Sequence, residues 1–118
     1  MAAAIPEPPE LRLTATRSDG TTHLAVAGEI DMATVDEFSA AVREHLAATP
    51  VLLDMRELTF MDSSGVRALD ALLRDAESAG WAFAIRSDMH RNVRRVLAMT
   101  GVLETLPLQD PPSSASAS

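Results

Sequence analysis

A polar block near the middle of the chain could take part in chemistry: Asp62, Ser63, Ser64 and Gly65. Asp and Ser are favoured N-cap residues, so we expect Ser63 at the start of a helix. Unpaired backbone N–H groups and the positive end of the helix dipole would favour an anion there. The block fits three interpretations: a helix cap with a permissive glycine, a nucleophilic serine, or an exposed serine that accepts a phosphate.

The surroundings of this block disfavour a nucleophilic serine. Such a serine usually lies in a G-x-S-x-G elbow or beside a histidine base. Met61 stands where an elbow needs a tight turn, and none of the three histidines, His23, His45 and His90, has a recognisable triad context. We therefore expect no catalytic residue. The residue types alone leave the helix cap and the phosphate acceptor open.

A second informative segment, Gly28-Glu29-Ile30-Asp31, ends an apolar strand just before a predicted helix. By itself it is typical of a turn with Asp31 as a cap. In a parallel α/β layout, however, the loops that follow successive strands gather at one edge of the sheet. Asp31 and Asp62 would then be neighbours, and that edge would be acidic.

Composition and charge narrow the class of protein. The chain has 118 residues, 47% of them apolar, which suits one globular domain. It has no Cys, and its histidines are scattered, so we expect no metal and no cofactor. The net charge of −7 disfavours nucleic acid and anionic membranes as partners. Met1 to Glu10 lacks the pattern of a signal peptide, and no stretch is apolar enough to span a bilayer, so we expect a cytoplasmic protein.

The pattern of apolar residues predicts an α/β fold over residues 11–108, between an N-terminal tail (1–10) and a disordered C-terminal tail (109–118). Strands alternate with helices in the order ββαβαβαβ, which requires right-handed crossovers and a mixed, mostly parallel sheet with helices packed on it. The arginine-rich third helix is predicted to be structural and solvent-facing. The expected strands are 11–16, 23–27, 51–53, 81–85 and 102–108, and the expected helices are 34–48, 66–76 with Gly80 as C-cap, and 91–99.

Three blocks in this order resemble the STAS domain family, in its anti-sigma factor antagonist branch. The blocks are Gly28 to Asp31, Leu52 to Gly65 with its F-M-D-S-S-G end, and Val93 to Leu97 followed by Thr100-Gly101. The resemblance runs from about Leu11 to Leu108. It implies a single STAS-type domain with the predicted element order. The arginine and alanine usage, with no lysine, favours a GC-rich bacterial genome.

This resemblance implies a switch in transcription regulation and not an enzyme. In its unphosphorylated form such a protein binds an anti-sigma factor that is also a serine kinase, which frees a sigma factor. Phosphorylation at the position of Ser63 ends the binding, and a serine phosphatase resets the switch. Arg67 departs from the small residue common at its position. The expected partner-binding residues are Glu29, Asp31, Met61, Asp62, Ser64, Gly65 and Arg67.

Two alternatives belong to other classes. One is a STAS scaffold or regulatory subunit, in a signalling cluster or on a lipid-transport ATPase, without a phosphorylation cycle. Whether Ser63 is ever modified discriminates it from the switch. The other is a small serine hydrolase, which a reactive serine probe would label at Ser63.

Overall fold

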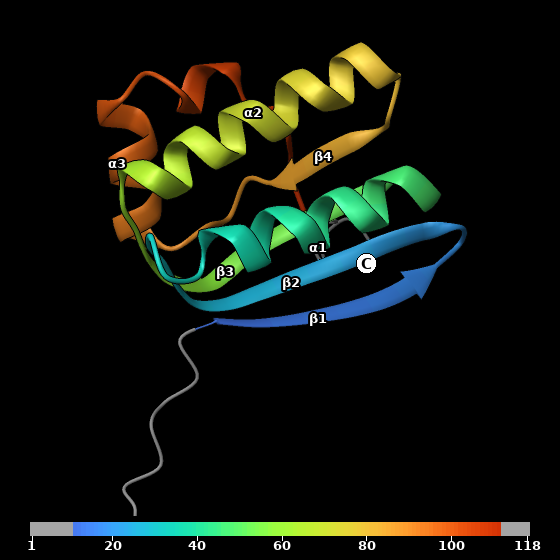
Figure 1. The fold of residues 1–118 in the computed structure, drawn as a ribbon, viewed down its shortest axis with the longest axis horizontal. Helices are drawn as coiled ribbons and strands as arrows, with labels where there is room; N and C mark the ends of the chain where they lie inside the picture. Colours follow the sequence, from blue (N-terminus) through green and yellow to red (C-terminus); the bar gives the residue numbers. More distant parts are fainter. Residues whose placement is uncertain (1–10, 112–118) are drawn as a thin grey trace, which may run out of the picture.

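The computed structural model describes residues 11–111, which form one five-stranded sheet and its helices (Figure 1). The predicted tail residues 1–10 and 112–118 lie outside the described residues. The order of elements agrees with the predicted ββαβαβαβ pattern. In chain order the elements are β1 (Leu11–Ser18), β2 (Thr21–Ile30), α1 (Val35–Ala48), β3 (Val51–Met61), α2 (Ser63–Ala79), β4 (Phe83–Arg86), α3 (Arg91–Met99), the 3₁₀ helix η1 (Leu103–Thr105) and β5 (Leu108–Gln109).

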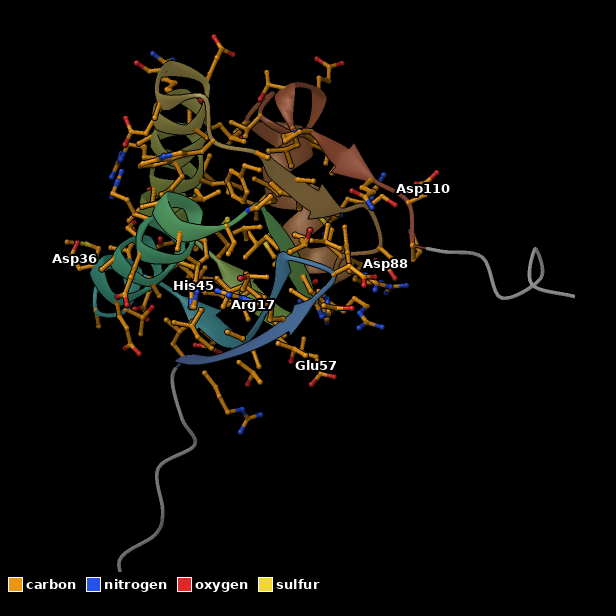
Figure 2. The ribbon with its side chains drawn as sticks, turned by 90° about the vertical axis from the view of Figure 1, so that its right-hand side faces the viewer. Arg17, Asp36, His45, Glu57, Asp88 and Asp110 are labelled. Atoms are coloured by element: carbon orange, nitrogen blue, oxygen red, sulfur yellow. The ribbon has the colours of Figure 1, made fainter. Side chains whose placement is uncertain are left out.

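The strands lie side by side in sequence order. β1 and β2 form an antiparallel hairpin, and β2, β3, β4 and β5 are mutually parallel. Right-handed crossovers that always step in the same direction leave their helices on one face of a sheet. Figures 1 and 2 show α1 and α2 together on that face. In Figure 2, Asp36 and Asp88 lie at the outside of the molecule.

The core lies between this helical layer and the sheet. Alternate residues of β2, such as Leu24 and Val26, are buried against the helices. α2 contributes Leu69 and Leu72, spaced three residues apart on its apolar face. Gly80 is the C-cap of α2, as predicted, with φ of 74°, a conformation that glycine adopts without a steric penalty. Among residues 11–111, no helix has the length and apolar character required to cross a bilayer.

β3 is much longer than the predicted strand 51–53 and leaves no loop before Met61. Two register shifts in its pairing with β2 explain the error. At each shift β3 contains an extra residue, so its buried positions change from a spacing of two residues to a spacing of three. The buried residues Met55, Leu58 and Met61 therefore do not alternate as an ordinary strand does.

The predicted strand 102–108 is also wrong over most of its length. Residues 103–105 form η1, where the Thr105 hydroxyl donates to the carbonyl of Val102 at 2.7 Å. Pro107, which has no N–H, follows. Only Leu108 and Gln109 pair with β4, although Gln109 belongs to the predicted tail. β4 begins at Phe83, since the Trp81 N–H still bonds to Ala76 at the end of α2.

Candidate functional site

The carboxyl ends of β2 and β3 bring the two predicted polar segments together. Glu29 pairs with Phe60 and Ile30 pairs with Met61, and the backbone N–H of Asp62 donates to the carbonyl of Ile30 at 3.1 Å. Asp31 and Asp62 thus follow a directly paired position on neighbouring strands, as the parallel layout predicts. We call the surface formed by residues 28–34 and 59–67 the switch edge.

Asp62 organises the start of α2. It is the N-cap, and its carboxylate accepts hydrogen bonds from the backbone N–H of Ser64 at 2.9 Å and of Gly65 at 3.3 Å. The Ser64 hydroxyl also donates to this carboxylate. This Ser64 bond lowers the pKa of Asp62 below its ordinary value, partial burial opposes the effect, and the backbone bonds and the charge of Arg67 support it.

Ser63 lies at the first position of α2 and is exposed to solvent. Its hydroxyl takes part in no side-chain hydrogen bond within residues 11–111, whereas the neighbouring Ser64 hydroxyl is held by Asp62. The hydroxyl of Ser63 is therefore accessible to another molecule, whereas the hydroxyl of Ser64 is engaged in a hydrogen bond. One detail departs from the sequence-based expectation: the N–H groups of Ser64 and Gly65 are already bonded to Asp62 and are not free for an anion.

Gly65 is needed because α2 passes very close to the strand ends. A Cβ atom on Gly65 would lie 2.5 Å from Cγ of Met61 and 2.9 Å from Cγ2 of Ile30. Met61 and Ile30 are both fully buried, so neither side chain has room to move. Met61 and Gly65 were predicted to bind a partner. Both are buried, and they support the exposed residues of the switch edge from below.

The loop between β2 and α1 forms the other half of the switch edge. The Asp31 carboxylate accepts hydrogen bonds from the N–H of Ala33 at 2.9 Å and of Thr34 at 3.2 Å. The buried Thr34 hydroxyl in turn donates to the carbonyl of Glu29 at 2.9 Å. These bonds fix the loop and leave Met32 at its tip, with 82% of its surface exposed.

Comparison with known proteins agrees with this geometry, since the family model of the STAS domain matches residues 12–115. The chain belongs to the STAS domain family.

Solved structures with this fold include anti-sigma factor antagonists. The chain is similar to an anti-sigma factor antagonist from Mycobacterium paratuberculosis, with 26% identity, coverage of 96% of this chain and 95% of that chain, and a TM-score of 0.73. It shares the fold of the anti-sigma factor antagonist SpoIIAA in its unphosphorylated form, at 20% identity, with coverage of 90% and 92% and a TM-score of 0.67.

A curated relative is the osmosensory protein A of Mycobacterium tuberculosis (strain ATCC 25618 / H37Rv). The two sequences are 35% identical over 65 residues, which is 54% of this chain. The match spans 41% of the length of that protein. The similarity therefore concerns one part of the relative, and what the rest of that protein does is not transferred to this STAS domain.

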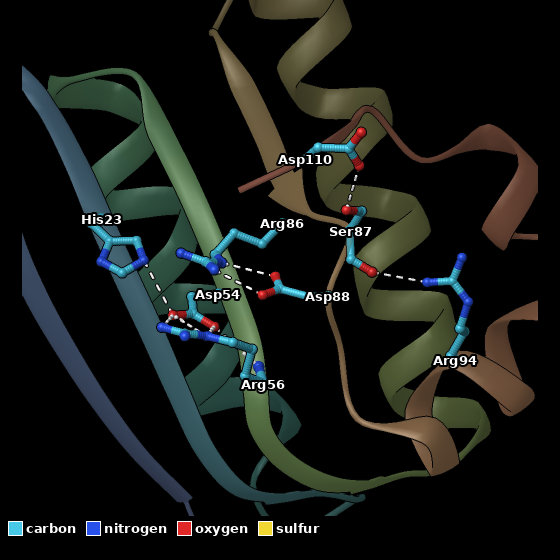
Figure 3. Close-up of polar contacts among 8 residues, drawn as sticks. All are labelled: His23, Asp54, Arg56, Arg86, Ser87, Asp88, Arg94 and Asp110. Carbon is cyan, nitrogen blue, oxygen red and sulfur yellow. Dashed lines mark hydrogen bonds and ion pairs between the residues drawn. The ribbon is translucent and has the colours of Figure 1, made fainter. Parts of the chain in front are cut away.

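The sheet face opposite the helices carries a polar cluster that sequence reasoning missed (Figure 3). Asp54 is buried in the middle of this face, and the guanidinium of Arg56 binds it through two nitrogens, at 3.0 and 2.7 Å. His23 Nε2 lies 3.2 Å from the same carboxylate, and Arg86 pairs with Asp88 beside it. The sequence does contain a signal for this cluster, because the acidic residue Asp54 directly follows the apolar residues 51–53 of a predicted strand.

The electrostatics of Asp54 favour a structural role for this cluster in the STAS domain. Burial acts to raise the pKa of Asp54, but the hydrogen bonds and charge of Arg56, with the charge of Arg86, outweigh it and lower the pKa. A carboxylate that stays ionised between cations is poorly suited to proton transfer. Within residues 11–111, no group of three His, Cys, Asp or Glu side chains is arranged to hold a metal ion.

Proposed function

We propose that this protein is an anti-sigma factor antagonist whose binding to its partner is switched by phosphorylation of Ser63. In this proposal the unphosphorylated switch edge binds an anti-sigma factor that is also a serine kinase, in the bacterial cytoplasm, and frees a sigma factor. A serine phosphatase resets the switch. The protein acts by binding and catalyses no reaction.

The observation that carries the proposal is the contrast between the two serines. Ser63 is exposed and its hydroxyl is unengaged within the described residues, while Ser64 donates to the cap carboxylate of Asp62. A kinase must reach an accessible hydroxyl, so Ser63 is the favoured acceptor. The likeness to solved anti-sigma factor antagonists supports the same role.

The surroundings of Ser63 explain how a phosphate would end binding. A phosphoserine adds a charge of about −1.5 to −2 next to Asp62, whose carboxylate already occupies the nearby N–H groups. Arg67, one helical turn further on, is the compensating cation, since its charge already acts on Asp62. The remaining charge faces the partner, where desolvation and repulsion weaken the complex.

Phosphorylation is expected to act locally and to leave the fold intact. α2 is anchored by Leu69, Leu72 and Ala76, which are buried in the core away from the switch edge. Charge added at an exposed first turn does not disturb these contacts. The circular dichroism spectrum of the phosphorylated protein should therefore overlay that of the unmodified protein.

The proposal is tested by identifying the cognate kinase in the host and mapping the phosphate by mass spectrometry. Ser63→Ala should resist phosphorylation and bind the kinase persistently. Ser63→Asp should bind more weakly by about 2.7 kcal/mol, which is about a hundredfold in affinity. Ser64→Ala is the matched control and should still be phosphorylated at Ser63. Phosphate on Ser64, or full binding by Ser63→Asp, would contradict the proposal, and a Ser63 that is never modified would favour the scaffold alternative.

A further inference from the structure

A hollow on α3 lies next to the switch edge. Its volume is about 280 Å³, and it is lined by Arg91, Asn92 and Arg95. The amide of Asn92 donates a hydrogen bond to the carbonyl of Thr59 at 3.3 Å, so the hollow begins one residue from Phe60 at the end of β3. The first turns of α3 and the switch edge are therefore parts of one continuous surface.

The two arginines of this hollow are available to a partner. Within residues 11–111, Arg91 and Arg95 form no ion pair, although Arg43, Arg56, Arg74 and Arg86 each pair with an aspartate. Both are exposed, and their spacing of four residues places them as neighbours on one helix face. Two neighbouring guanidinium groups repel one another, and a carboxylate between them would relieve the repulsion.

An exposed aromatic residue, Phe60, lies between the hollow and the rest of the switch edge. Phe60 has 44% of its surface exposed and is one of four large apolar side chains exposed in the described part of the chain. It pairs with Glu29 on the acidic side, while Thr59 contacts α3 on the basic side. Aromatic residues and arginines are both enriched among the residues that dominate binding at protein interfaces.

We propose that the recognition face extends from Ser63 across Phe60 to α3, and that Arg91 and Arg95 hold an acidic segment of the protein partner. This inference rests on the proposed function for the existence of that partner. Charge complementarity supports the choice of occupant: Glu29, Asp31 and Asp62 repel an acidic segment from the α1 side, whereas the arginines of α3 attract one. The charges thereby fix the orientation of the partner.

The first experiment measures affinity for the kinase that phosphorylates Ser63 at several salt concentrations on either side of about 0.15 M. The double variant Arg91→Glu with Arg95→Glu should bind about tenfold more weakly and lose most of the salt dependence of association. The control, Arg17→Glu with Arg74→Glu, changes the charge equally on β1 and on the later turns of α2, and should stay within about twofold of wild type. Equal affinities of the α3 variant and wild type would overturn the inference. Matching circular dichroism spectra establish that both variants fold.

A second experiment does not depend on the kinase. A peptide of alternating Glu and Leu residues is titrated into the full-length protein and followed by NMR, with a Lys and Leu peptide as control. Shifts at Arg91, Asn92, Arg95 and Phe60 that the α3 double variant abolishes support the inference. The inference is overturned if the acidic peptide leaves the NMR shifts of these residues unchanged. It is also overturned if duplex DNA or phosphatidylglycerol vesicles bind these residues more tightly than the acidic peptide does. If the peptide binds α3 but Ser63 is never phosphorylated, only the proposed function fails.

Discussion

At the scale of single residues, the switch edge depends on two contacts at the start of α2. Asp62 caps the helix, and Gly65 allows α2 to approach Met61 and Ile30. Both contacts hold Ser63 in position without touching its hydroxyl. Asp62 and Gly65 therefore position the serine and leave its hydroxyl accessible.

Gly65→Ala is expected to destabilise the protein. Alanine favours a helix over glycine by about 1 kcal/mol, but a Cβ here overlaps two buried side chains, and such overpacking costs about 1 to 3 kcal/mol. We expect a net loss of about 1 kcal/mol in the free energy of unfolding, measured in urea. In a Met61→Ala background, which removes the nearest atom and leaves only the contact with Ile30, Gly65→Ala should cost less. An equal loss in both backgrounds would contradict this explanation.

Asp62→Ala should lose the helix cap. Removing a capping side chain costs about 0.5 to 2 kcal/mol of stability, and Asp62→Asn, which keeps an acceptor oxygen, should cost much less. Urea unfolding of the three proteins measures the difference. The Ser64 hydroxyl loses its acceptor only in the alanine variant, so that variant should also allow phosphate to appear on Ser64. Equal stability of Asp62→Ala and wild type would argue against the cap.

At the scale of elements, α2 is held by its apolar face and not by its surface ion pairs. Leu69 and Leu72 are fully buried, whereas the pair between Arg74 and Asp70 is exposed. Leu69→Ala should lower the free energy of unfolding by about 2 to 5 kcal/mol, because it leaves a cavity under α2. Arg74→Ala should change it by less than about 1 kcal/mol. Thermal unfolding at several salt concentrations compares the two variants, and a larger effect of Arg74→Ala would contradict this view of α2.

At the scale of the whole molecule, the sheet has helices on one face, and the opposite face is organised around the ionised carboxylate of Asp54. Asp54 holds Arg56 and lies beside His23 and Arg86, so residues from three strands meet there. In this arrangement the positive charges of Arg56 and Arg86 compensate the buried negative charge of Asp54. It also makes part of the stability of the fold dependent on pH.

The pKa of Asp54 is lower in the folded protein than its ordinary value of 3.8, so the unfolded chain takes up the proton first on acidification. The stability that Asp54 contributes is complete above that value and is lost as the pH falls below it. Asp54→Asn should therefore be less stable than wild type at about pH 7 and closer to it at about pH 3. Urea unfolding across this range tests the prediction, with Asp36→Asn, exposed on α1, as control. A pH-independent difference would contradict it.

The sequence by itself determined the α/β class, the order of elements and the meeting of Asp31 with Asp62. Apolar periodicity is a local property that identifies each helix and strand, and alternating strands and helices can be connected into a parallel sheet in only a few ways. The sequence also placed Ser63 at a helix start, since Asp and Ser are strong caps. Tertiary structure decided the rest. The length of β3 depends on bulges formed against β2, the burial of Met61 depends on α2, and the contact of Asn92 with Thr59 joins residues far apart in the chain. Asp54 illustrates the reason: an isolated acid in a strand acquires its environment only when Arg56, His23 and Arg86 are brought around it by neighbouring strands.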